Sequence, residues 1–250
     1  MSMLVDKHMA ASVDSRTETN IFAIAGCSCE LLNDPTRTNA TASQLRSLAA
    51  SSRLLDVRRK IHGFAKVIPV NTALFRARRA GHRDARENLV MASQLAEDFS
   101  QNPKKPRGRC NCEGENCLYL SLTSSAASLE VANSGFVSLG EFRAITPLQL
   151  LDLTEDEAAS DDLRGYLRFR MSFSVEEVVK DVASFEAEYY TITQLIASLA
   201  RLERFDGILF SSTRIPGSHV ALFDASLVAF QGSTLRPVGL DDMAILVRTS

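Results

Sequence analysis

The segment RGRCNCEGENCLYLSLTSSAASLEV, residues 107–131, combines three cysteines with a strand-like run and a helix-like run. The apolar run CLYLSL, which carries Tyr119, predicts a short strand. The small and apolar residues that follow predict a short helix, capped by Ser124 or Ser125 and ended by Gly135. Two interpretations of the segment are open at this point: a metal-binding knuckle, or one wall of an active site.

The cysteines favour reduced thiols over a metal site. The chain holds five of them, Cys27, Cys29, Cys110, Cys112 and Cys117. An odd number in a chain large enough to fold without disulfides is typical of a reducing compartment. Structural zinc sites mostly use cysteines two to four residues apart, whereas a C-x-C spacing in an extended segment directs neighbouring cysteines to opposite faces. We therefore expect no metal, and a catalytically inactive, zinc-containing interaction module stays an alternative.

Composition indicates a globular protein of one large domain, or one domain with an appendage. The chain has 250 residues, of which 45% are hydrophobic and 23% charged, which is enough apolar material for a full core. Because 28 Lys and Arg residues nearly balance 30 Asp and Glu residues, we expect no nucleic-acid partner. The first residues lack an apolar run of signal-peptide or membrane-spanning length. We expect no membrane association, and a protein that works in the cytoplasm or is delivered into a target cell without a conventional signal peptide.

The N-terminal part of the chain predicts an arm, a helix, a strand and a second helix. Residues 1–40 are polar and weakly periodic, which indicates the arm. Residues 41–68 predict one helix, opened by a capping box of Thr41 and Gln44. Residues 67–78, VIPVNTALFRAR, predict a strand that ends in basic residues, with Arg76 at its end. Residues 84–101 predict the second helix.

The C-terminal part predicts clustered strands with two helices between them. The expected strands are 136–145, 166–173, 206–212, 219–224 and 227–232. Two interpretations of His219 are open: it serves a site, or it is an exposed strand-end residue. The expected helices are 174–185, opened by Ser174 and Glu177, and 191–205, opened by Thr191 and Gln194. Clustered strands favour an α+β fold over a doubly wound sheet. Neither common glycine-rich phosphate loop occurs.

Three ordered segments resemble the hallmark blocks of the RES domain, a family named for an arginine, a glutamate and a serine. They are LFRAR at 74–78, the segment 108–131 and the segment 190–223. The second block has Gly108, Arg109, Asn111 and Gly114 with eleven residues from Tyr119 to Glu130, and the third has Asp206, Gly207, Ile208, Phe210 and Ser212. The resemblance covers about residues 70–230. Cys110 stands where tryptophan is usual and His219 where asparagine is usual, and the first-block arginine is Arg76 or Arg78, with Arg76 favoured.

The resemblance implies a fold similar to the ADP-ribosyltransferase toxins: an α+β, mixed β-sheet core with flanking helices. We expect residues 66–250 to form the catalytic domain, preceded by an arm and helical extension at 1–65. Family members consume NAD+ by splitting nicotinamide from ribose, and several are toxins held inactive by an antitoxin. The partners to look for are NAD+, an antitoxin-like inhibitor protein and further copies of the chain.

The resemblance also implies roles for individual residues. Glu130 would stabilise the oxocarbenium-like ribose. Arg76 and Arg109 would bind the pyrophosphate of NAD+. Tyr119 would pack its ring on nicotinamide or ribose with its hydroxyl directed outward, and Ser212 would hydrogen-bond the amide or ribose.

Asn111 completes the set of expected NAD+-binding residues.

The sequence does not show which molecule attacks the ribose once nicotinamide leaves, and this acceptor decides the name of the reaction. Water gives a glycohydrolase and phosphate a phosphorylase, while a protein side chain, the alternative reaction, gives an ADP-ribosyltransferase.

Overall fold

The computed structural model describes residues 41–79, 108–112, 114–131, 135–154, 162–172, 182–212 and 217–238. Within these residues, eight strands form one sheet in the order β1-β5-β6-β7-β3-β2-β4-β8. The strands are β1 (Ala65–Ile68), β2 (Ala73–Arg79), β3 (Leu118–Ser121), β4 (Gly135–Ala144), β5 (Leu148–Leu153), β6 (Gly207–Ser211), β7 (Ser218–Leu222) and β8 (Val228–Val238). Neighbours are antiparallel except for the parallel pair β5 and β6. The expectation of an α+β fold with a mixed sheet is confirmed.

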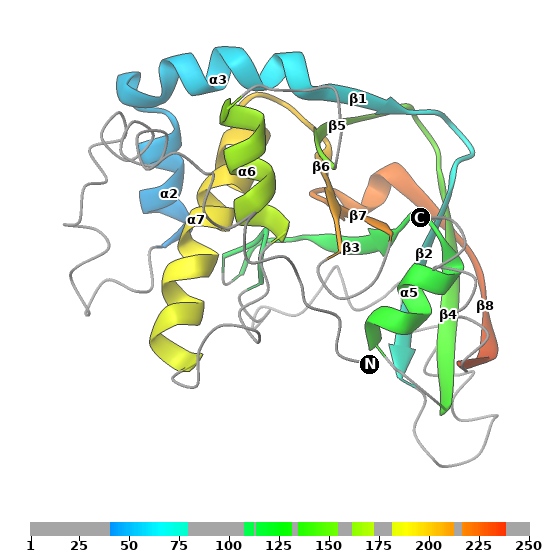
Figure 1. The fold of residues 1–250 in the computed structure, drawn as a ribbon. Coiled ribbons are helices and arrows are strands. Elements are labelled where there is room, and N and C mark those ends of the chain that lie inside the picture. The colour runs from blue at the N-terminus through cyan, green and yellow to red at the C-terminus, as the bar shows by residue number, and fades with distance from the viewer. Residues whose placement is uncertain are drawn as a thin grey trace.

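The helices divide between two regions of the sheet (Figure 1). They are α2 (Ala42–Ala49), α3 (Leu55–Ile61), α5 (Ser124–Val131), α6 (Asp162–Ser172) and α7 (Val182–Leu202), with short 3-10 turns at Ser52–Leu54, His62–Phe64 and Ala225–Leu227. Helices α2, α3, α6 and α7 gather beside β5 and β6, while α5 packs against β2. No helix among the described residues is long and apolar enough to cross a membrane.

The helical extension is docked onto the core that it precedes. The Thr41 capping box is confirmed, since Thr41 Oγ1 accepts a hydrogen bond from Gln44 N. The single helix expected over 41–68 is wrong: Ser51 is extended, which separates α2 from α3, and β1 begins at Ala65. Arg58 and His62 both bond the carboxylate of Glu203 at the end of α7.

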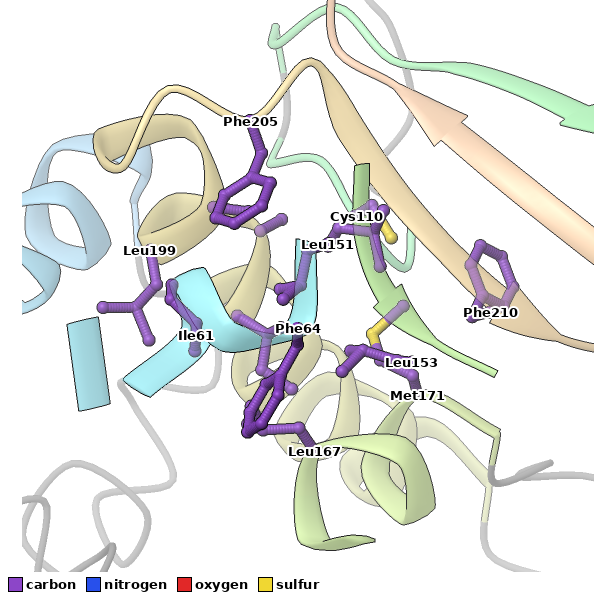
Figure 2. Close-up of a cluster of buried hydrophobic side chains, with 14 of the residues drawn as sticks. Ile61, Phe64, Cys110, Leu151, Leu153, Leu167, Met171, Leu199, Phe205 and Phe210 are labelled. Carbon is purple, nitrogen blue, oxygen red and sulfur yellow. The ribbon is translucent and has the colours of Figure 1, made fainter. Parts of the chain in front are cut away.

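A large apolar cluster lies between this extension and the sheet (Figure 2). Ile61 and Phe64 come from the extension, Leu151 from β5, and Leu199 and Phe205 from α7 and the residues after it, and all five are buried. Burying such side chains stabilises a fold by roughly 1.5–3 kcal/mol each. Residues before and after position 65 pack into this one cluster. A boundary between two domains at residue 65 stays a prediction from the sequence.

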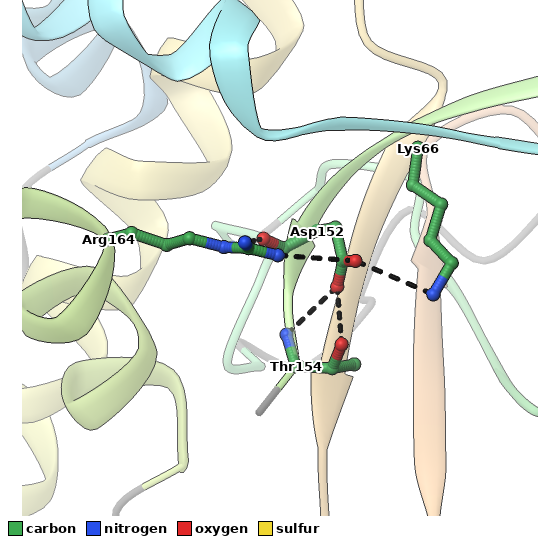
Figure 3. Close-up of polar contacts among 4 residues, drawn as sticks. All are labelled: Lys66, Asp152, Thr154 and Arg164. Atoms are coloured by element: carbon green, nitrogen blue, oxygen red, sulfur yellow. Dashed lines mark hydrogen bonds and ion pairs between the residues drawn. The ribbon is translucent and has the colours of Figure 1, made fainter. Parts of the chain in front are cut away.

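An ion cluster joins α6 and β1 to β5 (Figure 3). Asp152 on β5 is buried, lies 3.3 Å from Arg164 Nη2 and 3.5 Å from Lys66 Nζ, and accepts hydrogen bonds from Thr154 N and Oγ1. A buried carboxylate needs such partners, because an uncompensated buried charge costs several kcal/mol. The cluster thus fixes where α6 lies.

Several further sequence expectations differ from the structure. Residues 166–173 were expected to be a strand, but residues 166–172 lie in α6, whose buried Leu163, Tyr166, Leu167 and Met171 recur at helical spacing. The helix start at Thr191 is wrong, because α7 continues through it from Val182. Strand β5 was not predicted.

The strand expected over 67–78 is two strands, joined by a turn in which Asn71 has a φ of 65°. The predicted cap of α5 is wrong as well, since Thr123 Oγ1 accepts from Ala126 N. Helix α5 is described as far as Val131, residues 132–134 lie outside the described residues, and Gly135 opens β4. The arm at 1–40, the helix at 84–101 and residues 174–181 lie outside the described residues.

Candidate functional site

A cavity of about 350 Å³ opens between α5 and the middle of the sheet. Pockets that bind small ligands and cofactors start at about this volume. Its walls come from β2, β3, β6, β7, α5 and the turn that carries Arg109, which are distant in sequence. Of the predicted site residues, Arg76, Arg109, Tyr119, Glu130 and Ser212 line it, together with Arg78, Ser121, His219, Phe75 and Phe210.

The three arginines supply the positive charge of the cavity. Arg76 lies in the middle of β2, opposite Gly140 of β4, and not at the strand's end as expected. Burial, and next the charge of Arg78, lower the pKa of Arg76 to about 9. The guanidinium is thus charged at neutral pH but partly stripped of water, a state that an anionic ligand stabilises. Because Arg76 and Arg78 both line the cavity, either can be the first-block arginine.

Contacts with α6 and with β6 hold the Arg109 side chain in place. Its Nη1 donates to the carbonyl of Met171 on α6 at 2.9 Å, and its guanidinium carbon lies 5.7 Å from the centre of the Phe210 ring. The ion cluster at Asp152 fixes α6, so it also contributes to the position of Arg109. A guanidinium held in this way is pre-oriented, which reduces the entropy lost on binding.

A buried turn at 108–112 carries Arg109 together with Gly108 and Asn111 of the second block. Gly108 and Asn111 pair across it, and Gln194 Nε2 of α7 donates to both of their carbonyls at 2.8 and 2.9 Å. A side chain at Gly108 would collide with Asn111 Oδ1 and the Tyr119 hydroxyl. These contacts explain why glycine suits this position.

The structure places Asn111 and the hydroxyl of Tyr119 in this turn and not in the cavity. Tyr119 OH accepts from Cys110 N at 2.7 Å and donates to Asn111 Oδ1 at 3.0 Å. Burial, with smaller effects from Cys117 and Cys110, raises the pKa of Tyr119, so the hydroxyl keeps its proton. Asn111 is 6% exposed and does not line the cavity. The outward hydroxyl expected for Tyr119 is wrong, and only its position in the cavity wall agrees with the expectation.

Three side chains converge at an acidic corner of the cavity, formed by Glu130, Ser212 and His219. Glu130 reaches it from α5, with a side chain that is 43% exposed. Ser212 Oγ donates to Glu130 Oε2 at 3.3 Å, and His219 Nε2 lies 3.6 Å from the same oxygen. The corner combines a carboxylate open to a ligand with a hydroxyl that bonds one of its oxygens and an imidazole nitrogen close to the same oxygen.

Of the two interpretations of His219, the exposed strand-end residue is wrong, and the structure places the side chain in the wall of the cavity. It is 8% exposed within β7, and its Nδ1 lies 2.8 Å from Ser121 Oγ on β3. Burial, and to a lesser degree the charge of Arg109, lowers the pKa of His219 below 6.5, although Glu130 opposes the shift. The imidazole is therefore neutral at pH 7.

The sequence left open whether His219 serves a site and did not single out Ser121, because a single position in a short strand carries little signal of what it faces. Strands β6 and β7 pair antiparallel with Ser211 opposite Ser218, so residues just beyond β6 and just inside β7 come together. Nothing in the sequence alone distinguishes Ser121.

The cysteines of the turn are buried thiols. Cys110, Cys112 and Cys117 form no disulfide. Burial raises the pKa of the Cys110 thiol to about 12 and that of Cys117 further. No group of three or more potential metal ligands occurs among the residues that the structure describes. Cys27 and Cys29 lie outside those residues, so the zinc-module alternative gains no support from the described part of the chain.

Comparison with known proteins agrees with the order of the three blocks. The profile of the RES domain matches residues 73–237. No curated protein matches the chain. Among solved structures, the crystal structure of the M. tuberculosis MbcT–MbcA toxin–antitoxin complex is similar with a TM-score of 0.44 and 13% sequence identity, over 78% of this chain and 98% of that chain.

Proposed function

Because this chain belongs to the RES-domain family, we propose that it cleaves the bond between nicotinamide and ribose in NAD+ and so depletes the dinucleotide. The observation that carries the proposal is the composition of one cavity, in which the Glu130 carboxylate and the guanidinium groups of Arg76 and Arg109 line the same space. An acidic group beside cations suits a ligand with an incipient ribose cation and a pyrophosphate.

The acidic corner suits the bond-breaking step. When the bond between the ribose anomeric carbon and the nicotinamide nitrogen breaks, both electrons leave with nicotinamide, which becomes neutral. The ribose is left with oxocarbenium character, and a carboxylate within contact distance stabilises that charge. Glu130 has this role in the proposal. Ser212 positions it by donating to Oε2.

The remaining walls suit binding of the dinucleotide. Arg76 and Arg109 offer planar forks that can each bond two pyrophosphate oxygens. The rings of Phe75, Tyr119 and Phe210 line the cavity and provide apolar faces for nicotinamide or ribose. Asn111 is assigned to the framework of the turn in this proposal and not to contact with NAD+, because its amide bonds within the turn.

The acceptor defines the reaction, and we rank water or phosphate first. A protein acceptor, which would make the chain an ADP-ribosyltransferase, is the alternative. Depletion of NAD+ harms the cell that contains the enzyme, so we also propose a toxin role with an antitoxin-like inhibitor protein. Action in the cytoplasm, where NAD+ is available, follows from the same reasoning.

Product analysis tests the proposal. Purified full-length protein is incubated with NAD+ alone, with added phosphate, and with a candidate acceptor protein, and the products are separated by chromatography. We expect nicotinamide in every reaction, with free ADP-ribose, its 1″-phosphate or modified protein identifying the acceptor. Absence of nicotinamide from all three reactions would overturn the proposal.

A further inference from the structure

His219 is buried among groups that direct one of its nitrogens toward Glu130. Ser121 on β3 faces Nδ1 at 2.8 Å, and Glu130 Oε2 on α5 faces Nε2 at 3.6 Å. Nε2 is buried and has no hydrogen bond to any described residue. Buried polar nitrogens are nearly always hydrogen-bonded. A movement of a few tenths of an ångström would bring Nε2 and Glu130 Oε2 into hydrogen-bond distance.

The two neighbours of the ring determine which nitrogen carries the proton. A carboxylate can only accept, so the ring nitrogen that faces Glu130 has to be the protonated one. In a neutral ring the other nitrogen then accepts, and the Ser121 hydroxyl can donate to it. The order of donation runs from Ser121 to His219 to Glu130.

We propose that His219 is a positioning residue that, in the Nε2–H form selected by the Glu130 carboxylate and supported by Ser121 at Nδ1, closes on Glu130 Oε2 and turns the other carboxylate oxygen toward the substrate. The inference rests on the proposed function, because it assigns a role in the NAD+ reaction. Ser212 already donates to the same Oε2, and His219 Nε2 lies 3.6 Å from it.

The charges around His219 support a neutral ring in this role. Glu130 faces it from α5, Arg109 from the buried turn, and the Phe210 ring from β6, with ring centres 5.8 Å apart. Arg76 from β2 lines the same cavity. Burial lowers the pKa of His219 below 6.5, so the ring gains its proton only in acid. An imidazolium beside Glu130 would neutralise the charge that stabilises the ribose cation, so activity falls as the pH drops through that pKa.

Three variants and one control test the role. His219→Gln keeps an N–H group near the position of Nε2, whereas His219→Leu removes it, and Ser121→Ala removes the hydroxyl that donates to Nδ1 and so supports the Nε2–H form. His62→Gln is the control, because His62 also bonds a glutamate, Glu203, but does not line the cavity. All four proteins are checked for the wild-type melting temperature.

We expect the effect in kcat and not in KM, because the orientation of Glu130 matters most in the transition state. His219→Leu lowers kcat by about a hundredfold, and Ser121→Ala by about tenfold, which are typical costs of misplacing a reacting group. His219→Gln stays within about fivefold of wild type, and its acid loss of activity moves to lower pH because glutamine does not titrate. His62→Gln behaves as wild type.

A spectroscopic measurement keeps this inference separate from the proposed function. The ¹⁵N chemical shifts of the His219 ring report its tautomer in the protein without substrate, and we expect the Nε2–H form in wild type and a mixture in Ser121→Ala. An Nδ1–H ring, or equal kcat in His219→Leu and wild type, overturns the inference while NAD+ cleavage stands. Failure of the wild type to cleave NAD+ overturns the proposed function, and the tautomer measurement still decides the geometry.

Discussion

The buried turn at 108–112 and the acidic corner both adjoin the cavity, but their polar groups have different partners: those of the turn bond to the protein, and those of the corner face the space for a ligand. In the turn, the Tyr119 hydroxyl and the Gln194 amide bond to other groups of the protein. In the corner, the Glu130 side chain is 43% exposed to the cavity. The residues of one family pattern therefore divide into a framework and a set that faces the ligand.

The difference predicts two kinds of mutational result. Loss of a polar partner in the turn leaves buried groups unsatisfied, so stability falls. When a polar group in the corner is lost, water can hydrogen-bond to the partner that it leaves behind. Activity therefore falls while the unfolding free energy stays the same. Arg109 connects the two regions, because its backbone belongs to the turn and its guanidinium lines the cavity.

The largest expected change in stability follows from Gln194→Leu. The carbonyls of Gly108 and Asn111 each lose the Gln194 donor and keep only the backbone bond across the turn, which costs about 3 kcal/mol of unfolding free energy. Urea denaturation measures the loss. The matched control is Gln231→Leu on β8, where the side chain is exposed and its bond reaches only Ala229 O, and we expect it to change stability by less than about 0.5 kcal/mol. Equal losses in both variants would contradict the framework role of Gln194.

Tyr119→Phe is expected to cost less, because the ring stays and only the hydroxyl is lost. The N–H of Cys110 and the amide oxygen of Asn111 lose a partner, at a cost of about 2 kcal/mol in unfolding free energy. Thermal and urea denaturation report this value. A fully stable variant with a raised KM for NAD+ would instead assign the hydroxyl to the substrate.

Arg76→Lys tests whether the guanidinium of Arg76, which lines the cavity, binds the substrate. Lysine keeps the charge and loses the planar fork, so we expect about a tenfold rise in KM for NAD+, equal to about 1.4 kcal/mol of binding. Steady-state kinetics give KM, and calorimetry gives the melting temperature, which should stay near that of wild type. Arg78→Lys run in parallel identifies the first-block arginine as the one with the larger effect. Unchanged KM in both variants would remove the pair from substrate binding.

The order and spacing of the three blocks, more than the local pattern, indicated which residues lie together in one cavity. The gap between Tyr119 and Glu130 is set by β3, a short turn and α5, which together return Glu130 to the cavity that Tyr119 lines. Asp206 shows the same principle in the framework: its carboxylate accepts from Gln149 N at 2.7 Å and so joins the start of β6 to β5.

Expectations failed where tertiary contacts decide the outcome. The run at 166–173 alternates apolar and polar residues and also has apolar residues three and four apart, and packing of α6 against β5 selects the helix. Asn111 matches the family pattern, yet its role depends on Gln194, which is far away in sequence. The burial of His219 was not predicted, because burial of a strand position depends on the neighbouring strands.

Release of nicotinamide from NAD+ by wild type, Glu130→Gln and Glu141→Gln tests the central claim most directly. Glu141 on β4 is a matched control, with a side chain that is 37% exposed and paired with Arg143 outside the cavity. We predict release by wild type and Glu141→Gln at equal rates, and a rate at least about a hundredfold lower for Glu130→Gln. Equal release by Glu130→Gln and wild type would contradict the assignment of Glu130 as the group that stabilises the ribose cation.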